Sequence, residues 1–535
     1  MHSMAFVICA VALGCSSSKA TSTPVPAGAA TTGGVVPVPA STTVVGPVAS
    51  SSVPVPTEVV TVPVIGKATG WARESVHPLE WPVPSDADQF HPTATVELSY
   101  DGGVTWAVDG DGPVAEGYTR WTVPALGPSN AKLSIVLHKY DALGVEILRR
   151  RIPLLDANFV PSQKAKYAWQ RVADNAPFGP RDGAGGLVFN GKMWLIGGWN
   201  GDVFPLVSAN DVWSSVDGAT WTKEKPNTFV DPVTFDRTRD WEGRHFAGYQ
   251  VFGGKMWIIG GDVVQGYYQT DVWSSTDGKV WTRRDIHTVT PRKDPSGFEY
   301  PADVWPPVEE SQFGLRALHM TGVFGGKLYL MGGQRIEQFV DPVWPGKPGK
   351  ALNDVWTSVD GASWTQVQTQ GPMWAPRGFV SEVVELGGRM WLIGGGTHDD
   401  PTAGRPDREY FNDVWSTTDG VHWEQMPYKP PFSGRLWHNV KAFDGRLWVI
   451  NGYDGHIPGA GRVADNTSDV WYSVDGSNWY SAQPPGTFVP RHAGTVWLHD
   501  GALFVGSGNA FTTDPAAPDG PGKWVAEVWK MAVAR

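Results

Sequence analysis

The chain has 535 residues, enough for two or three domains, with a formal net charge of −11 and a pI near 5.6. This acidic balance argues against nucleic acid as a partner, because a basic face would then be expected, and no long basic run is available for an anionic membrane surface. The 64 glycines, 44 prolines and 28 tryptophans, without long amphipathic helical patterns, predict an all-β protein with many tight turns.

Residues 5–14 form a short apolar stretch of signal-peptide length that is too short to span a bilayer as a helix. It leads into Ala12-Leu13-Gly14-Cys15, which resembles a bacterial lipobox, and Ser16 resembles the sorting signal of outer-membrane lipoproteins. The resemblance implies a signal peptide over residues 1–15 and lipidation of Cys15. It further implies export across the inner membrane and anchoring at the outer membrane or cell surface. A plain cleaved signal is the alternative.

The two cysteines, Cys9 and Cys15, both lie in this leader. The rest of the chain therefore has no disulfide, no thiolate metal ligand and no thiol nucleophile. Residues 16–66 are rich in Ser, Thr, Pro, Val, Ala and Gly and contain no aromatic residue. Such a segment cannot bury enough surface to offset its chain entropy, so we expect a disordered tether.

Residues 67–160 contain short runs of alternating apolar and polar residues separated by turn residues. Examples are 94–100 (ATVELSY) and 132–137 (KLSIVL). This spacing predicts a small β-sandwich, and the stretch around Trp106 and Trp121 resembles the Ig-like or fibronectin-like modules of bacterial surface proteins. Such modules are spacers or adhesion units, and nothing in this one indicates catalysis.

From about Tyr167 to Arg535 one unit recurs six times, which predicts a repeat architecture. Each unit has an arginine, a strand, a tight turn, a strand ending in Gly-Gly, an Asp-Val-Trp strand, a Ser-x-Asp-Gly turn and a last strand. The six arginines are Arg181, Arg244, Arg316, Arg377, Arg435 and Arg491. The glycine pairs begin at Gly197, Gly260, Gly332 and Gly394 and degrade to Asn451-Gly452 and Ser507-Gly508.

Four strands joined by hairpins make one blade of a β-propeller. The double glycine followed by an aromatic strand resembles the kelch repeat, and the resemblance implies a six-bladed kelch propeller over residues 167–535. The sixth unit ends soon after Glu527-Val528-Trp529, whereas the strand around Trp169 has no unit before it. We therefore expect this N-terminal strand to complete blade six and close the ring. The Ser-x-Asp-Gly-x-x-Trp turns also resemble the Asp-box of sialidases, and we interpret them as structural turns with the tryptophan packed beneath.

Loop lengths indicate which face of the propeller carries function. The first-to-second and third-to-fourth strand connections are tight turns, whereas the other connections are long and must emerge together on the opposite face. The six arginines follow or border these long loops. We expect them to ring the channel mouth, where they would either bind an anionic or hydroxyl-rich ligand or tie the blades together. The ligand candidates also include Trp199, Trp241, Tyr268, Tyr410 and Tyr453.

Two classes of function remain open at this stage. The first is a cell-surface module that binds a glycan or a protein on the long-loop face. The second is a carbohydrate-active enzyme, either a sugar epimerase or mutarotase or a glycosidase, with an acid or base drawn from the same loops. The candidate acids are Glu309, Glu310, Asp399, Asp400 and Glu409.

The resemblance to galactose oxidase, another kelch propeller, does not extend to its copper radical chemistry. That cofactor needs a Cys–Tyr crosslink, and the folded part has no cysteine. We expect no cofactor and no metal ion. His245 and His492 directly follow their arginines, and His319 and His438 lie three residues after theirs. We expect all four histidines to pack between blades.

Overall fold

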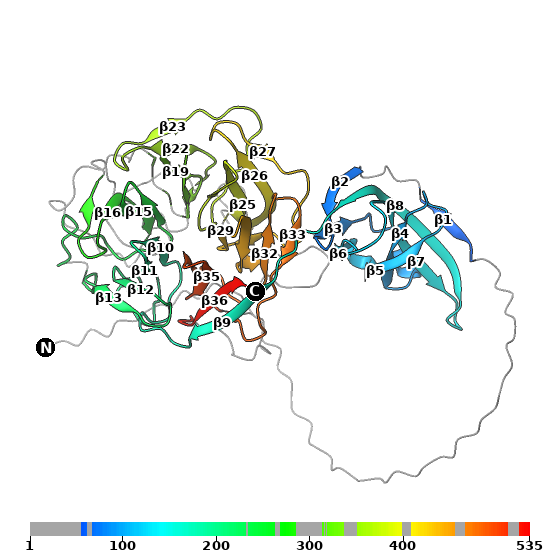
Figure 1. The fold of residues 1–535 in the computed structure, drawn as a ribbon, viewed down its shortest axis with the longest axis horizontal. Helices are drawn as coiled ribbons and strands as arrows, with labels where there is room; N and C mark the ends of the chain where they lie inside the picture. The colour runs from blue at the N-terminus through cyan, green and yellow to red at the C-terminus, as the bar shows by residue number, and fades with distance from the viewer. Residues whose placement is uncertain are drawn as a thin grey trace, which may run out of the picture. The chain divides into compact units, whose positions relative to one another are not determined.

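The computed structural model describes residues 55–60, 67–231, 234–262, 268–284, 313–314, 316, 318–335, 350–397, 408–454, 466–511 and 524–534. Strands dominate this part of the chain, and its helical content is limited to the short 3₁₀ turns η1 (Ala87–Gln89) and η2 (Val114–Glu116) (Figure 1). The prediction of an all-β protein is therefore confirmed. No helix among the described residues is long and apolar enough to cross a membrane.

The N-terminal strands form one sheet in the order β1-β8-β7-β4-β5, with β2 also paired to β8. The bounds are β1 (Thr57–Val59), β2 (Lys67–Ala72), β4 (Thr93–Ser99), β5 (Ala107–Pro113), β7 (Asn130–Tyr140) and β8 (Glu146–Val160). Strand β1 lies inside the segment 16–66 that the composition predicts to be disordered. It pairs parallel with β8 in the register Thr57 to Arg149, and Glu58 forms an ion pair with Arg150 at 2.9 Å. The tether prediction is wrong for these three residues, because pairing with β8 supplies the hydrogen bonds that composition alone cannot reveal.

A second, smaller layer is formed by β3 (Val76–Glu80) and β6 (Tyr118–Thr122). Leu79 and Trp121 from this layer share a core with Val96, Leu133 and Ile152 from the larger sheet. The pair also extends a neighbouring sheet, because Val76 of β3 pairs with Trp479 of β33 (Trp479–Ser481). Residues 96–99 and 133–138 are buried without alternation, so both faces of β4 and β7 are covered along these stretches.

Apart from two short pairs, the remaining described strands form six antiparallel sheets, five of them four-stranded and one continuing from its fourth strand into β3 and β6. The first sheet contains β10 (Gly185–Phe189), β11 (Lys192–Ile196), β12 (Val212–Ser215) and β13 (Thr222–Lys225). The second contains β14 (Gly248–Phe252), β15 (Lys255–Asp262), β16 (Tyr268–Ser275) and β17 (Thr282–Arg283). The third contains β18 (Met320–Phe324), β19 (Lys327–Met331), β22 (Val355–Ser358) and β23 (Thr365–Val367).

The fourth and fifth sheets are β24 (Val384–Leu386), β25 (Arg389–Thr397), β26 (Glu409–Thr417) and β27 (Glu424–Gln425); and β29 (Asn439–Phe443), β30 (Arg446–Ile450), β32 (Val470–Ser473) and β33. The sixth is β34 (Thr495–His499), β35 (Ala502–Gly506), β36 (Val528–Val533) and, from the other end of the sequence, β9 (Tyr167–Ala173). Trp169 of β9 is opposite Met531 of β36. Two short pairs join β20 (Gln334–Arg335) to β21 (Lys350–Ala351) and β28 (Arg435–Leu436) to β31 (Tyr453–Asp454).

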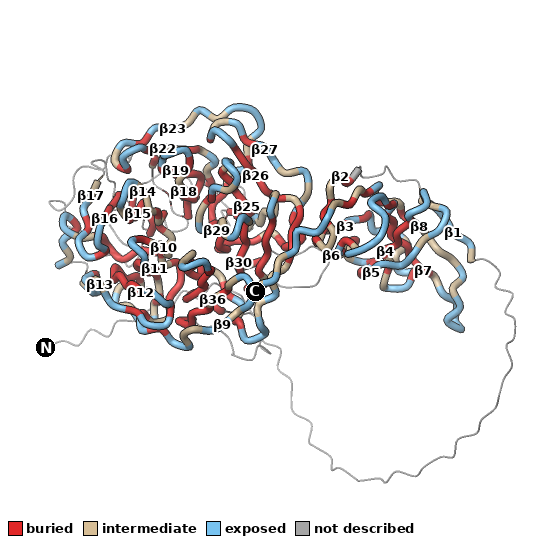
Figure 2. Tube along the Cα trace, viewed as in Figure 1, coloured by how far each residue is buried: buried red, intermediate tan, exposed pale blue. Residues whose placement is uncertain are grey.

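The first strands of the six sheets contact one another in sequence. Strand β10 contacts β14, β14 contacts β18, β18 contacts β24, β24 contacts β29, and β29 contacts β34. Strand β34 of the sixth sheet in turn contacts β10 of the first. The buried segments in Figure 2 follow the second and third strands, where runs such as 193–196 and 447–450 are fully buried.

The predicted Ser-x-Asp-Gly turns join the third and fourth strands of five sheets. In the second sheet, the Asp277 carboxylate accepts hydrogen bonds from the backbone N–H groups of Lys279 and Val280 at 2.9 and 3.0 Å. The hydroxyl of Ser275 accepts from the Gly278 N–H at 2.8 Å, and the Trp281 indole donates to the Gly278 carbonyl at 3.2 Å. These bonds satisfy the backbone of the turn locally and agree with the structural interpretation of the motif.

The glycine of each turn packs on an aromatic ring of the preceding sheet. A Cβ added at Gly278 would lie 2.2 Å from the ring of Trp194 in the first sheet. The other glycine and ring pairs are Gly361 with Trp257, Gly420 with Tyr329, Gly476 with Trp391, and Gly218 with Phe504. Trp448 of the fifth sheet is covered instead by Tyr167 of β9, with ring centroids 4.7 Å apart. Each second-strand aromatic residue is thus covered by the next sheet.

We expect Gly278→Ala to be more destabilising than Gly191→Ala. Both glycines have positive φ, 72° and 70°, so either alanine costs about 1–2 kcal/mol of backbone strain. At Gly191 no atom lies within 4 Å of the added Cβ, whereas at Gly278 the methyl group meets Trp194 and overpacking adds about 1–3 kcal/mol. Urea unfolding of the two variants measures the difference, and equal losses would show that the sheets are not packed as described.

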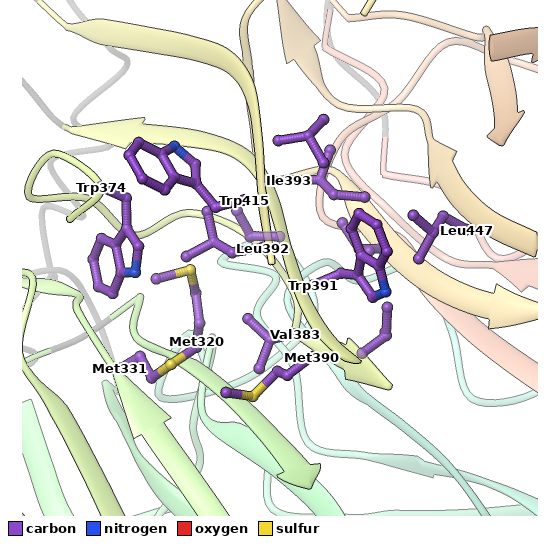
Figure 3. Packing of buried hydrophobic residues seen from close by; sticks show 14 of the residues in the cluster. Met320, Met331, Trp374, Val383, Met390, Trp391, Leu392, Ile393, Trp415 and Leu447 are labelled. Carbon is purple, nitrogen blue, oxygen red and sulfur yellow. The ribbon is translucent and has the colours of Figure 1, made fainter. Parts of the chain in front are cut away.

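The largest core cluster spans the third, fourth and fifth sheets (Figure 3). Met320 and Met331 of the third sheet lie against Leu392 of the fourth, and Trp391 of the fourth faces Leu447 of the fifth. Apolar side chains from both faces of a sheet therefore pack against its two neighbours, which explains why the second strands are apolar without alternation.

Candidate functional site

The six predicted arginines are buried, with exposed fractions of 0–3%. Each makes an ion pair with the acidic residue that directly precedes the Val-Trp pair in the third strand of its own sheet. The pairs are Arg181–Asp211, Arg244–Asp271, Arg316–Asp354, Arg377–Asp413, Arg435–Asp469 and Arg491–Glu527. The sequence leaves two roles open for the arginines. Their burial in ion pairs favours the structural role, in which they hold strands together, over direct contact with a ligand.

Arg435 illustrates the geometry. Its guanidinium donates to both Asp469 oxygens, at 2.6 and 3.1 Å, and to the Asn451 carbonyl at 2.9 Å. Burial alone would raise the pKa of the Asp469 carboxyl, but the charge and hydrogen bonds of Arg435 lower it to about 2. Asp469 also accepts the Trp471 indole N–H at 2.7 Å, so Asp-Val-Trp is one hydrogen-bonded unit with the arginine.

The sixth sheet departs from this pattern. Glu527 replaces the aspartate and pairs with Arg491, but the Trp529 indole nitrogen is buried without a hydrogen-bond partner among the described residues. In the five other sheets the aspartate accepts the indole N–H of the tryptophan two residues on. The longer glutamate therefore keeps the ion pair and loses the indole bond.

Four of the glycine pairs connect their sheet to the next one. The carbonyl of the first position accepts from the arginine of its own sheet, as Gly260 does from Arg244 at 3.0 Å. The N–H of the second glycine donates to the carbonyl of the arginine in the following sheet. This bond joins Gly198 to Arg244, Gly333 to Arg377, Gly452 to Arg491 and Gly508 to Arg181. Positive φ at both glycines of a pair, such as 64° and 109° at Gly197 and Gly198, makes these two bonds possible.

The residue two positions after each arginine has a left-handed backbone, with φ between 50° and 65°. These six residues are Gly183, Phe246, Leu318, Phe379, Trp437 and Ala493. Backbone hydrogen bonds run from Phe246 to Gly183, Gly183 to Ala493, Ala493 to Trp437, Trp437 to Phe379 and Phe379 to Leu318, at 2.6–3.1 Å. Every one of the six sheets is therefore linked to this chain of bonds. The sequence did not predict it, because five of the six residues are not glycine.

The side chains of these residues form an apolar cluster in which Leu318, Phe379 and Trp437 are buried. A cavity of about 70 Å³ lies beside the cluster and is lined by residues of all six sheets, including Tyr249, Ser381, Asn439 and Thr495. It has room for several water molecules. Lys441 and Glu382 form an ion pair at this cavity.

Aromatic rings from four sheets form a continuous cluster at the end of the first strands where the arginines lie. Trp199 lies 5.3 Å from Trp524 and 6.0 Å from His245, and Trp437 lies 5.0 Å from His492 and 5.9 Å from Tyr453. Phe246 connects the two halves, 3.9 Å from His245 and 6.5 Å from Trp437. We call Trp199, Phe246, Trp437, Tyr453 and Trp524 the aromatic cluster; all but Trp437 are half-buried.

Charged and polar groups lie within and beside the aromatic cluster. The Arg408 guanidinium carbon is 5.4 Å from the ring centroid of Trp437 and 5.9 Å from that of Tyr453. His492 shares a hydrogen bond of 2.6 Å with Asn466, and burial, with Arg408 and His245 nearby, lowers its pKa to about 3. The cluster thus combines half-buried aromatic rings with a cation and hydrogen-bonding groups.

His245 lies between two buried carboxylates. Its Nδ1 is 3.1 Å from Asp262 Oδ1, and its Nε2 is 3.6 Å from Asp182 Oδ1. Asp182 Oδ2 accepts from the Asn509 amide at 3.1 Å and the Trp524 indole at 3.3 Å. Burial raises the pKa of the Asp182 carboxyl, and the neighbouring donors offset this only in part. Asp182 Oδ1 and Asp262 Oδ2 are buried without hydrogen-bond partners among the described residues.

The other residues that the sequence predicts for the site lie in several different environments. Trp199 and Tyr453 belong to the aromatic cluster, and the half-buried Tyr410 packs beside Leu436 and Trp437. Trp241 is fully buried, 5.9 Å from Trp281, so it belongs to the core. Tyr268 begins β16 opposite Asp262. Glu409 is exposed and accepts from Thr397 Oγ1 at 3.3 Å. The candidates Cys15, Glu309, Glu310, Asp399 and Asp400 lie outside the described residues.

Sequence reasoning missed Asp182 and Asp262 as site residues and assigned His245 to packing. One signal was available, since Asp182, His245 and His492 occupy the same position of the repeat, directly after the arginine. Asp262 follows a glycine pair and carries no such signal. Within the ranges given above, no group of three His, Cys, Asp or Glu residues is arranged to hold a metal ion.

No family model and no curated protein matches the chain. Among solved structures, the chain is similar to one titled "Structure of YjhT", with 14% sequence identity and a TM-score of 0.45. The match covers 68% of this chain and 97% of that one.

Proposed function

We propose that the six sheets are the blades of a closed, six-bladed kelch-type β-propeller, preceded by an Ig-like sandwich. Three observations support it: the successive contacts of the first strands from β10 round to β34 and back, the backbone bonds that connect all six sheets, and the pairing of β9 with β36. Such closure leaves few free strand edges.

We propose that the protein binds a glycan at the mouth of the central channel, on the aromatic cluster. The observation that carries this proposal is the run of half-buried rings from Trp524 to Tyr453 with Arg408 against it. The faces of tryptophan and tyrosine complement the C–H faces of sugar rings, and the histidine, arginine and carboxylate groups suit hydroxyls. A protein ligand on the same face is the alternative.

The apolar cluster around Leu318 and Phe379 supports a shallow site at the mouth. Leu318 and Phe379 are buried in the same packed cluster as Phe246, Trp437 and Tyr453, so a ligand on the aromatic cluster would rest on an apolar floor. Concave sites with few polar groups on an apolar floor are typical of small-ligand recognition.

A glycan microarray probed with the full chain tests this proposal. We expect binding to a defined group of glycans, and a loss of at least about tenfold in affinity for the double variant Trp199→Ala/Trp524→Ala. Trp169→Ala is the matched control, because Trp169 is equally half-buried but lies on the outermost strand of the sixth sheet. Unchanged binding by the double variant, or an array without binding, would refute the assignment.

A second candidate function is catalysis on a sugar, and the Asp182–His245–Asp262 arrangement favours it. Asp262 would orient the imidazole, His245 Nε2 would take a proton from an anomeric hydroxyl, and Asp182, whose pKa is raised, would return one to the ring oxygen. These transfers open the ring to the aldehyde, the C1–C2 bond rotates, and the reverse transfers at His245 and Asp182 close the ring on the other carbonyl face, so the net result is interconversion of anomers. NMR measurement of anomer exchange in glucose, galactose and N-acetylglucosamine tests it, with His245→Gln expected to be inactive and His499→Gln active.

We further propose that the protein is exported and anchored to the outer membrane or cell surface through lipid on Cys15. Cys15 lies outside the described residues, and the proposal rests on the lipobox-like Ala12-Leu13-Gly14-Cys15. Labelling with an alkyne fatty acid in a bacterial host is expected to modify the wild type and to spare Cys15→Ser. Equal labelling of both would exclude the anchor.

A further inference from the structure

The sandwich domain has a polar surface on one end of its larger sheet. In the antiparallel pair β7–β8, Asn130 is opposite Asn158 and Lys132 is opposite Asp156. Directly opposed residues point to the same face, and the next residues in line, Ala131 and Ala157, are buried on the other face. Four polar side chains therefore form a two-by-two group facing solvent.

The turn after β4 folds back beside this polar group. Ser99 is the register partner of Lys132, and Asp101 holds the turn by accepting from the N–H groups of Val104 and Thr105 at 3.0 and 2.9 Å. Gly103 lies close to the Lys132 methylene chain, because a Cβ at Gly103 would be 3.8 Å from Lys132 Cδ. The rigid turn fixes Tyr100, which is 38% exposed.

A cleft of about 350 Å³ lies between the turn and the polar group. Ser99, Tyr100 and Gly102 line one side, and Asn130, Lys132, Asp156 and Asn158 line the other, with Ala68 and Thr69 of β2 at the end. This volume is in the range of small-ligand sites, which is roughly 300–1,000 Å³.

The polar groups of the cleft are only partly used within the protein. Asn158 donates to Asn130 Oδ1 at 2.9 Å. The Lys132 ammonium and the Asp156 carboxylate, although opposite in register, have no ion-pair or hydrogen-bond partner among the residues that the structure describes. A positively charged donor, a negatively charged acceptor and two asparagine amides thus lie in the same cleft as the Tyr100 ring.

This chemistry selects among ligand classes. One lysine beside one aspartate gives no net positive charge, which disfavours phosphate and other anions. None of the described residues that line the cleft is a large aliphatic residue, which disfavours a lipid chain. A neutral, hydroxyl-rich chain that stacks on Tyr100 and exchanges hydrogen bonds with the two asparagines matches all the groups present.

We infer that the cleft formed by Tyr100, Asn130, Lys132, Asp156 and Asn158 is a second glycan-binding site, which takes a neutral oligosaccharide segment. The inference rests on the proposed glycan-binding function of the propeller. Two sites on one chain would let the protein hold a polysaccharide at two points and gain affinity by linkage.

Affinity electrophoresis of the full chain tests the second site, in native gels cast with laminarin, galactomannan, xylan or dextran. We expect at least one polysaccharide to retard the wild type, and Tyr100→Ala and Asn130→Ala each to lower the apparent association constant about tenfold. Tyr140→Ala is the matched control, because Tyr140 is 44% exposed on the same domain at the far end of β7. It should migrate as the wild type does.

The double variant Trp199→Ala/Trp524→Ala separates the two proposals. If the polysaccharide still retards this double variant, the cleft is supported. If the double variant is no longer retarded while Tyr100→Ala is retarded as strongly as the wild type, the cleft proposal is wrong and the propeller site is supported. If no gel retards the wild type, the cleft proposal is wrong, and the microarray still decides the propeller site independently.

Discussion

Replacing Arg435 by methionine is expected to lower the free energy of unfolding by about 3–5 kcal/mol. Arg435 is completely buried, and its removal leaves the Asp469 carboxylate without its counter-charge and the Asn451 carbonyl without its donor. The Asp469 side chain is only 27% exposed and the equivalent acidic side chains are 5–19% exposed, so an unpaired carboxylate is costly at each position and the loss should recur at the other arginines. Urea unfolding followed by tryptophan fluorescence measures it.

Two controls define the origin of this loss. The double variant Arg435→Met/Asp469→Leu removes both charges and should regain most of the lost stability, because a buried ion pair is often replaceable by apolar residues. Arg389→Met breaks the exposed pair with Glu424 and should cost at most about 1 kcal/mol. A stable Arg435→Met variant, or a double variant as unstable as the single one, would contradict a structural role for the arginines.

Acidification from pH 7 to pH 5 is expected to destabilise the protein well before its carboxylates titrate. Burial lowers the pKa values of His77, His319, His438 and His492 from 6.5 to about 3. Below pH 6.5 the unfolded chain binds protons at these histidines and the folded chain does not. The stability they contribute is therefore complete above pH 6.5 and is lost progressively toward pH 3.

The free energy of unfolding is expected to fall by up to about 1.4 kcal/mol per pH unit of acidification for each such histidine. Urea unfolding at pH 7, 6 and 5 measures the total, and His438→Gln should reduce the slope by one histidine's share. A free energy of unfolding that stays constant between pH 7 and pH 5 would show that these imidazoles are accessible to protons in the folded state.

Local sequence signals predicted the strands and turns well. The Ser-x-Asp-Gly turns act within a few residues, so Asp277 and Gly278 could be interpreted without knowing what surrounds them. The strand at Trp169 was identified from the unit missing at the other end of the repeat, and in the structure it pairs with β36. Both inferences need only sequence patterns and strand geometry.

The electrostatic roles were harder to predict, because they depend on partners distant in sequence. Arg435 and Asp469 are separated by 34 residues, and only the folded sheet shows that they form a hydrogen-bonded ion pair. The left-handed backbone at Phe246 and Trp437 is disfavoured by local preference and is imposed by hydrogen bonds between sheets. For the same reason the Asp182–His245–Asp262 arrangement was not found from the sequence.

The six arginines are buried in ion pairs within their sheets, and we propose that a ligand binds to the aromatic cluster beside them. A crystal structure of the full chain with the strongest ligand from the microarray tests this most directly. We predict a sugar ring stacked on Trp199, Trp524 or Tyr453, within hydrogen-bond reach of Arg408 or His245, and no sugar atom touching the six buried arginines. A sugar bound on the face of the tight turns, or held by Arg181 or its equivalents, would contradict it.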